Sequence, residues 1–191
     1  MNIFSIPIHM CELQEIDNNS LVSYAYSLRD NNTGRTLSNK GGWQSDILND
    51  NILNMLLIKI LTNISYYANL LDVKKDKTIS FTNTWLNING QNDYNINHVH
   101  DGFISGVYYP QTSPDMGCLR LENHNNLKSI SWHGNNFNNY NTHNAENFLV
   151  SPKTGLLVLF PSWLEHGVEP NSVNEDRISF SFNTRIENAV S

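Results

Sequence analysis

Two histidines separated by one residue, His98 and His100, have the residue type and spacing that best fit metal chemistry. Alternate residues of a β-strand point to the same face, so both imidazoles can converge on one cation. We expect a third ligand from a distant segment, and His166 is the best candidate because it follows the apolar run Leu156–Phe160. A structural or surface pair of histidines has the same spacing, so this motif alone does not decide.

A second candidate site lies in the segment Arg177–Asn183, where polar and apolar residues alternate without exception. This pattern predicts a strand whose apolar residues, Ile178, Phe180 and Phe182, pack on helices, while its polar residues face the interior. A buried arginine is costly unless it meets a negative charge. Arg177 should therefore pair with an Asp or Glu of the protein or with a ligand, and its planar guanidinium suits a dicarboxylate.

The elements that must position these residues begin with a helical region over residues 1–77. Apolar residues recur there at helical spacing in two stretches separated by glycine-rich sequence. We expect the second helix to begin near Ser45 or Asp46, which are both acceptable N-caps. The intervening segment, residues 38–45, is too short and too rich in glycine to predict regular structure.

Residues 78–191 change to the two-residue period that is typical of strands. Strands are expected from Thr78 to Ile88 and at His98–His100, Ile104–Tyr109, Cys118–Glu122, Leu156–Phe160 and Arg177–Thr184. Helices followed by many short strands predict a mainly β (α+β) fold, a double-stranded β-helix or jelly roll with the N-terminal helices packed on the outside of one sheet. We expect one domain over 1–191, with a helical support region at 1–77 and a jelly-roll core at 78–191.

Charge and composition argue against several classes of protein. The net charge is −6 with only 12 Lys and Arg, which disfavours a protein that binds nucleic-acid phosphates. No run of 18 apolar residues exists, so no membrane span is expected. The N-terminus lacks the basic start and apolar stretch of a signal peptide, and Cys11 and Cys118 form neither a disulfide framework nor a zinc-ligand spacing. We therefore expect a cytoplasmic protein.

Asparagine is unusually frequent, with 31 residues among 191. The apolar residues are patterned along most of the chain, so a biased genome composition explains the excess better than disorder does. The segment Asn123–Asn147 is the exception, because it holds ten of the asparagines and has weak periodicity. We expect a long loop at 123–147, and loops of this length in compact domains often act as functional lids.

The ordered set of motifs resembles a known family. The segments that carry the resemblance are Ser38–Ser45 (SNKGGWQS), Trp85–Asn87, His98–His100, Ser105–Tyr109, Phe160–His166 and Arg177–Asn183. They are similar to the Fe(II)- and 2-oxoglutarate-dependent oxygenases of the double-stranded β-helix fold, close to the prolyl-hydroxylase-like branch found in marine phages and bacteria. The resemblance implies Fe(II), 2-oxoglutarate and O2 as cofactor and co-substrates, and a location in a bacterial cytoplasm or an infected host cell.

The resemblance places the metal on His98, His100 and His166. The usual iron site has two histidines and one carboxylate, and His100 occupies the carboxylate position here. Three arrangements stay open: an all-histidine site, a site in which Asp101 replaces His100 through a bulge, or a site in which Asp101 supports a ligand from behind. Zinc could also occupy such a site in purified protein.

The resemblance also implies a co-substrate site. Arg177, eleven residues after His166, matches the arginine that binds the far carboxylate of 2-oxoglutarate, and Ser179 completes the RxS pattern that accompanies it. Tyr109 matches a tyrosine that hydrogen-bonds the same carboxylate. Asn87 matches a position that contacts the co-substrate in related oxygenases.

The function that the resemblance implies is hydroxylation of a C–H bond, of a prolyl residue in a peptide or protein or of a small molecule, with release of succinate and CO2. His98, His100, His166 and Arg177 would be the catalytic residues. Two rival functions remain at this point: a zinc-dependent cupin-like hydrolase or isomerase, and a non-catalytic binding module. Arg177 disfavours the first, which needs no dicarboxylate anchor, and the intact histidines disfavour the second.

Overall fold

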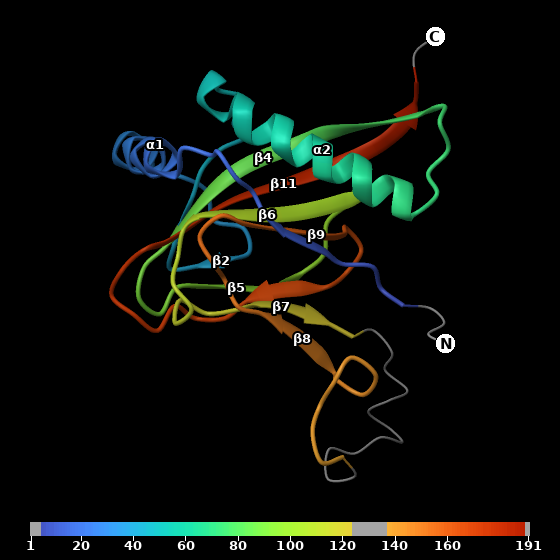
Figure 1. The fold of residues 1–191 in the computed structure, drawn as a ribbon. Helices are drawn as coiled ribbons and strands as arrows, with labels where there is room; N and C mark the ends of the chain where they lie inside the picture. The colour runs from blue at the N-terminus through green and yellow to red at the C-terminus, as the bar shows by residue number, and fades with distance from the viewer. Residues whose placement is uncertain (1–4, 124–136, 190–191) are drawn as a thin grey trace.

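Two antiparallel β-sheets face each other in the computed structural model, which describes residues 5–123 and 137–189 (Figure 1). The six-stranded sheet has the order β1 (His9–Glu12), β9 (Leu156–Pro161), β6 (Ile104–Gln111), β11 (Arg177–Asn188), β4 (Lys77–Asn89) and β3 (Trp43–Gln44). The five-stranded sheet has the order β2 (Asn39–Lys40), β5 (Tyr94–His98), β10 (His166–Val168), β7 (Leu119–Glu122) and β8 (Asn147–Val150). This arrangement confirms the predicted mainly β double-stranded β-helix.

Two helices, α1 (Asn18–Asn31) and α2 (Asn54–Leu70), cover the outer face of the six-stranded sheet (Figure 1). The buried residues of α2 recur at helical spacing and include Leu56, Ile60 and Ile64, so one stripe of the helix faces the sheet. They pack in one cluster with the apolar face of β11, which consists of Ile178, Phe180 and Phe182. The predicted packing of helices on the outside of one sheet is therefore confirmed.

A second cluster of buried apolar residues lies between the two sheets. It consists of Val107, Tyr109, Leu119, Leu121, Val150, Val158, Phe160 and Leu164. Strands of both sheets contribute to it, as the alternation of inward and outward side chains along each strand requires. This core holds the two sheets together at one end and leaves the polar face of β11 to line a cavity.

The prediction that the second helix begins near Ser45 or Asp46 is wrong. Helical structure begins with a short 3-10 turn, η1 (Asn51–Leu53), which leads into α2. Before it, the chain runs extended beside β4, where the backbone amide of Ser45 donates to Leu86 O at 2.9 Å. The Ser45 hydroxyl accepts from the amide of Leu86 at 3.0 Å, so it pairs with a strand instead of capping a helix.

The region before residue 77 also contains strands that the helical period does not predict. Segment 38–45 forms β2 and β3, which join different sheets, contrary to the expectation of no regular structure there. β1 pairs with β9 at the edge of the six-stranded sheet. These strands are two to four residues long, too short to produce a readable period.

The strand predicted at His98–His100 ends earlier than expected. β5 stops at His98, and His100 follows in irregular backbone whose amide donates to Ser162 O at 3.0 Å. The predicted strands Ile104–Tyr109, Leu156–Phe160 and Arg177–Thr184 correspond to β6, β9 and β11.

The Asn-rich segment 123–147 connects β7 to β8, which pair with each other as a hairpin. At its base, the amide of Asn123 donates to Glu146 O at 2.8 Å. Residues 124–136, the greater part of the predicted lid, lie outside the described residues. Among the described residues, neither helix combines the length and the apolar character that crossing a membrane would take.

Candidate active site

The polar side chains of β11 and of its neighbour β4 lie next to each other on the same face of the six-stranded sheet. Their register pairs Arg177 with Asn89, Ser179 with Asn87, Ser181 with Trp85, and Asn183 with Asn83. The alternation in both strands thus places one continuous row of polar and aromatic side chains on the inner surface of the six-stranded sheet. Most of these residues line a pocket between the sheets, into which the three candidate histidines also project.

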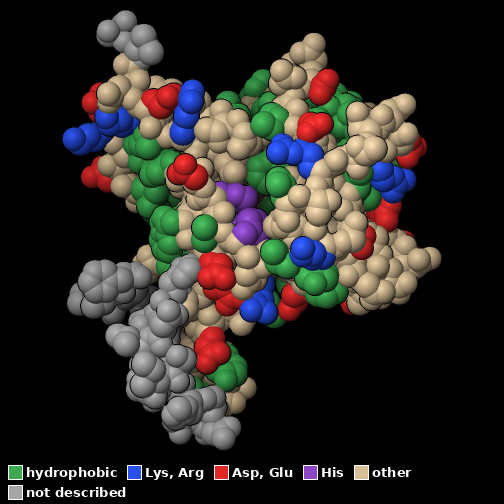
Figure 2. Space-filling view, turned by 180° about the vertical axis from the view of Figure 1, so that it is seen from behind, with side chains coloured by type: hydrophobic (Ala, Val, Ile, Leu, Met, Phe, Trp, Pro, Cys, Tyr) green, Lys and Arg blue, Asp and Glu red, His purple; other side chains and the backbone are tan. Residues whose placement is uncertain are grey.

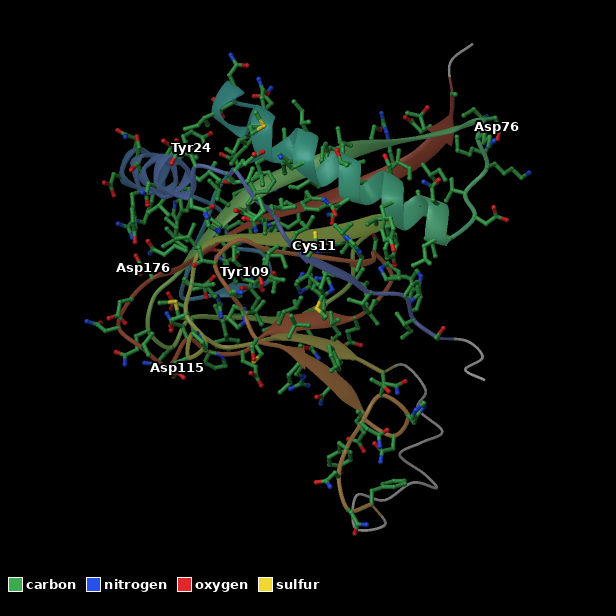
Figure 3. The ribbon with its side chains drawn as sticks, in the orientation of Figure 1. Cys11, Tyr24, Asp76, Tyr109, Asp115 and Asp176 are labelled. Carbon is green, nitrogen blue, oxygen red and sulfur yellow. The ribbon has the colours of Figure 1, made fainter. Side chains whose placement is uncertain are left out.

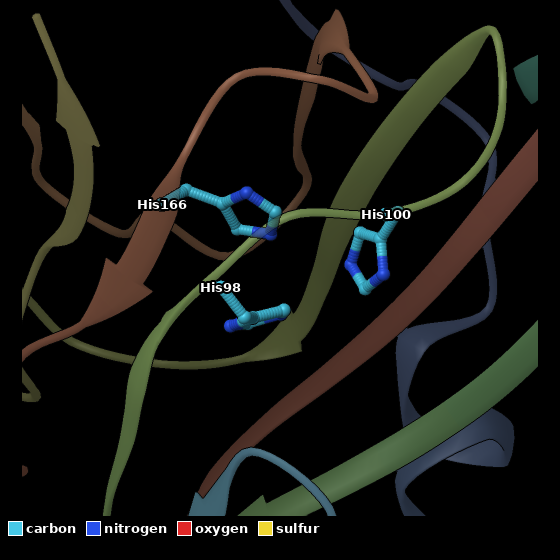
Figure 4. A group of neighbouring side chains, drawn as sticks. All are labelled: His98, His100 and His166. Carbon is cyan, nitrogen blue, oxygen red and sulfur yellow. The ribbon is translucent and has the colours of Figure 1, made fainter. Parts of the chain in front are cut away.

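The three histidines come together in the lining of this pocket (Figure 4). His98 and His166 are direct cross-strand partners on β5 and β10, and their ring centroids are 4.4 Å apart. The ring of His100 lies 4.8 Å from that of His98 and 5.1 Å from that of His166. One potential ligand atom from each residue lies within 4.8 Å of the others, which is close enough to surround one metal ion.

Hydrogen bonds to backbone carbonyls fix the tautomers of two of these rings. Nδ1 of His98 lies 2.7 Å from Ile96 O, and Nδ1 of His166 lies 2.8 Å from Leu164 O. A carbonyl oxygen only accepts, so each Nδ1 carries the proton and donates it. Each Nε2 then keeps its lone pair, as metal-ligating histidines require.

The electrostatic setting also favours a bound cation. Burial, reinforced by the neighbouring histidines, lowers the pKa of His166 to about 3 and that of His100 to about 4. Burial also lowers the pKa of His98. All three rings are therefore neutral at neutral pH, and neutral imidazole is the form that binds metals.

Asp101 is not part of this cluster. Its side chain is exposed, and the group of potential ligands found in the described part of the chain consists of the three histidines. The rings of His98 and His100 lie close together, as expected. The cause differs from the predicted one, because β5 ends at His98 and irregular backbone, not the two-residue period of a strand, brings His100 to the same side.

Arg177 is 1 % exposed and reaches into the same pocket from β11. Its Nη1 donates to the carbonyl oxygens of Met116, Gly117 and Glu169. Its Nη2 is buried without a hydrogen-bond partner, and across residues 5–123 and 137–189 no carboxylate forms an ion pair with it. The sequence predicts that Arg177 pairs with a carboxylate of the protein or with a ligand. The described residues provide no such carboxylate, and one donor of a residue that lines the pocket stays unpaired.

Tyr109, on β6, is buried between the two sheets (Figure 3) and lines the same pocket as Arg177. Burial raises the pKa of its hydroxyl to about 12, although the nearby positive charge of Arg177 acts in the opposite direction. The hydroxyl is therefore protonated at neutral pH and can donate a hydrogen bond. Arg177 and Tyr109 together provide two donors at the inner end of the pocket.

Asn87 and Ser179 lie side by side between these donors and the histidines. The amide of Asn87 contacts the hydroxyls of Ser179 at 3.4 Å and Ser181 at 3.3 Å, and its remaining polar atom is buried without a partner. Because hydroxyls can donate as well as accept, a flipped amide would accept from both serines and direct its NH2 group into the pocket.

The sequence-based prediction missed Asn89, Ser105 and Trp85 as pocket residues. Asn89 and Trp85 lie two residues on either side of Asn87, so the period of β4 could have found them. Ser105 offered no such signal, because its place in the pocket depends on the pairing of β6 with β9 and β11.

A family model described as "Putative 2OG-Fe(II) oxygenase" matches residues 83–183, just over half of the chain. The chain belongs to this family of 2-oxoglutarate- and Fe(II)-dependent oxygenases. The match contains every site residue predicted from the sequence. No curated protein matches the sequence.

The oxygenase is similar in fold to several solved structures. A prolyl-4-hydroxylase from Pseudomonas putida is 14 % identical, with a TM-score of 0.65 over 95 % of this chain and 93 % of that one. HygX from Streptomyces hygroscopicus, with nickel, 2-oxoglutarate and hygromycin B bound, is 11 % identical, with a TM-score of 0.64 over 94 % and 83 %. A Trichoplax adhaerens prolyl hydroxylase in complex with a peptide fragment is 16 % identical, with a TM-score of 0.60 over 91 % and 83 %.

The oxygenase uses Fe(II) and 2-oxoglutarate, as its family does. The pocket fits both groups. Three neutral imidazoles, two of them with Nε2 left free by the hydrogen bonds of Nδ1, suit iron, and a buried guanidinium nitrogen that lacks an acceptor suits a carboxylate. Figure 2 shows histidine side chains at the bottom of a hollow in the face of the molecule, so the metal position is open to a substrate.

Proposed function

We propose that this oxygenase hydroxylates a prolyl residue in a peptide or protein and converts 2-oxoglutarate to succinate and CO2. The observation that carries the oxygenase chemistry is the unpartnered Nη2 of Arg177, buried in the same pocket as three neutral histidines. The prolyl hydroxylases among the similar structures support the choice of substrate.

We assign the metal to His98, His100 and His166, each through one ring nitrogen. The carbonyls of Ile96 and Leu164 hold two of these rings in the ligating tautomer and orientation. Held by these residues, Fe(II) would supply the O2 activation that hydroxylation of an unactivated C–H bond needs. Because the three histidines would supply only three ligands, a bound metal would keep positions for 2-oxoglutarate and O2.

We assign the co-substrate to the inner end of the pocket. Arg177 would bind the far carboxylate of 2-oxoglutarate through Nη2. The hydroxyl group of Tyr109 would donate a hydrogen bond to the same carboxylate. Ser179 and Asn87 would hold the remainder of the molecule between this anchor and the metal. Burial strengthens each of these hydrogen bonds, because water does not compete for the donors.

The alternative of a zinc hydrolase on the same histidines leaves Arg177 and Tyr109 without a role.

We also propose that the enzyme works in a cytoplasm. Its two cysteines are free, as is usual for proteins in a reducing compartment.

The test is co-substrate turnover by the purified protein. Anaerobic protein mixed with Fe(II) and 2-oxoglutarate should give a weak visible absorption band, and oxygen should then cause slow release of succinate even without a second substrate. Peptides that contain proline should accelerate this release and gain one oxygen atom by mass spectrometry. Correctly folded, iron-loaded protein that releases no succinate would contradict the proposal.

A further inference from the structure

An open cleft leads from His98 and His100 to the surface, and Arg177 is not among its lining residues. Its floor is formed by Asn83 and Asn183, and Trp85 lies at its inner end next to His98 and His100. Its walls carry exposed apolar side chains, namely Leu37, Ile47 and Ile96. A substrate whose C–H bond is to reach the metal must lie across these residues.

The cleft is nearly free of charge. Apart from the neutral histidines, Arg35 is the charged residue among its described lining, and it lies 3.7 Å from the exposed carboxylate of Asp46. No carboxylate from the described part of the chain lines the cleft. A cationic substrate would therefore lose its hydration without gaining a partner, which disfavours it relative to a neutral one.

A buried chain of hydrogen bonds sets the orientation of the Asn183 amide. Ser105 Oγ lies 2.7 Å from Asn183 Oδ1 and 2.8 Å from Ser162 Oγ. Both serines are almost fully buried, at 1 % and 0 % exposure. With the Asn183 amide oriented as in the structure, Ser105 donates its single hydroxyl proton to Oδ1, so Ser162 is the donor in the contact between the two serines. The NH2 group of Asn183 then points away from the serines.

The backbone next to Asn183 is also held in place. The pairing of β11 with β4 shifts register between Asn183 and Thr184, which marks an irregularity of the bulge type. The hydroxyl of Thr184 bonds to both the amide and the carbonyl of Ile104, at 3.0 and 2.8 Å. Bulges of this kind re-aim side chains beside active sites, and here the side chain so aimed lines the cleft.

We propose that Asn183 is the positioning residue for the acceptor substrate, and that its NH2 group donates to a carbonyl oxygen of an uncharged, peptide-like chain lying across the cleft. This inference rests on the proposed function and specifies how the same site selects its substrate. Asn83, the cross-strand partner of Asn183, adds a second amide on the floor. Two adjacent carboxamides match the alternating donors and acceptors of a peptide backbone, and the apolar walls match uncharged side chains.

The first test compares substrates. A panel of N-acetylated, C-amidated pentapeptides with a central proline flanked by alanine, valine or leucine is assayed beside the same panel with lysine flanks. We expect the apolar panel to accelerate succinate release and the lysine panel to have a KM at least about tenfold higher, which corresponds to about 1.4 kcal/mol. Equal or better turnover of the lysine panel overturns the inference.

The second test compares variants with the best apolar peptide. Asn183→Asp keeps the shape and the acceptor for Ser105 but removes the donor that faces the cleft. We expect it to raise the peptide KM by about tenfold or more, and to raise it far more than the KM for 2-oxoglutarate. Ser105→Ala removes the hydroxyl that holds the Asn183 side-chain amide, so this amide can rotate. We expect a smaller rise of the peptide KM than in Asn183→Asp. The matched control is Asn188→Asp, at the exposed end of the same strand, which should behave like the wild type.

The outcomes separate this inference from the proposed function. If no peptide accelerates turnover although the protein releases succinate from 2-oxoglutarate alone, the peptide-like substrate is wrong while the oxygenase chemistry stands. If Asn183→Asp behaves like Asn188→Asp, then the amide does not donate to the substrate. If folded, iron-loaded protein releases no succinate under any condition, the proposed function itself fails.

Discussion

His98 and His166 are direct cross-strand partners on β5 and β10, although 67 residues of chain separate them (166 − 98 − 1). Each donates its Nδ1 proton to the carbonyl oxygen of the residue two positions earlier. The two strands therefore present a matched pair of Nε2 lone pairs, and His100 closes the group from irregular backbone. This relationship places two members of the histidine cluster on adjacent strands of the smaller sheet, and the third on the segment that directly follows β5.

Replacement of His100 should identify the third ligand. We expect His100→Ala to lose most of its bound iron, since two histidines alone leave the ion weakly held, and Asp101→Ala to retain wild-type content because its side chain is exposed outside the cluster. His100→Asp should retain metal, because it restores a common ligand set for Fe(II). Metal analysis after dialysis measures all three, and a larger loss in Asp101→Ala would contradict the all-histidine assignment.

Arg177→Lys should separate co-substrate binding from folding. Lysine cannot supply two directed donors, so we expect the KM for 2-oxoglutarate to rise about 10- to 100-fold, as the loss of a charge-assisted hydrogen bond implies. Iron content should stay near the wild-type value. If iron content and thermal stability fall together with the affinity for 2-oxoglutarate, Arg177 mainly holds the carbonyls of Met116, Gly117 and Glu169, and the anchor lies elsewhere.

Tyr109→Phe removes one hydroxyl and no packing surface. Because the Tyr109 hydroxyl stays protonated at neutral pH, the variant loses a neutral donor, and we expect the KM for 2-oxoglutarate to rise about 3- to 10-fold. The melting temperature of the protein without 2-oxoglutarate should change little. A steady-state titration of 2-oxoglutarate measures the effect, and an unchanged KM would remove Tyr109 from the co-substrate site.

The stability of the metal-free protein should fall in mild acid. Burial lowers the pKa of His166 to about 3, whereas the unfolded chain titrates near the ordinary value of about 6.5. Between these values the unfolded state binds more protons, so the free energy of unfolding decreases as pH falls. From pH 6.5 to 5.5 this residue alone accounts for about 1 kcal/mol.

Urea denaturation in the presence of a chelator at several pH values measures this effect. His166→Gln should have a shallower pH dependence than the wild type, whatever its stability at neutral pH. Parallel curves for the two proteins would show that protonation of His166 in the unfolded state does not drive the acid sensitivity.

The strand period made much of the fold and part of the site predictable. The polar face of β11 was readable because Arg177, Ser179 and Asn183 alternate with large apolar residues. The beginning of α2 was not readable, because Ser45 has the chemistry of a helix cap but bonds to Leu86 on a neighbouring strand. Local preference cannot reveal a partner that lies 41 residues away.

The cleft could not be predicted from the sequence either. Arg35 is held by an isolated bridge to Gln44 of β3 in the larger sheet, whereas the position of Ile96 depends on how β2 and β5 join the smaller sheet. The link from Ser162 through Ser105 to Asn183 joins three strands or their ends. Such relationships arise from the register between distant strands, and no single segment encodes them.

The carbonyls that Arg177 holds belong to two different connections, Met116–Gly117 between β6 and β7 and Glu169 after β10. Both connections must dock before the guanidinium is fixed in the pocket. A ligand that engages Nη2 therefore recognises only chains whose two sheets have already joined at this end. Its binding would be coupled to closure of the barrel, so that the supply of such a ligand would protect the enzyme from opening and from degradation.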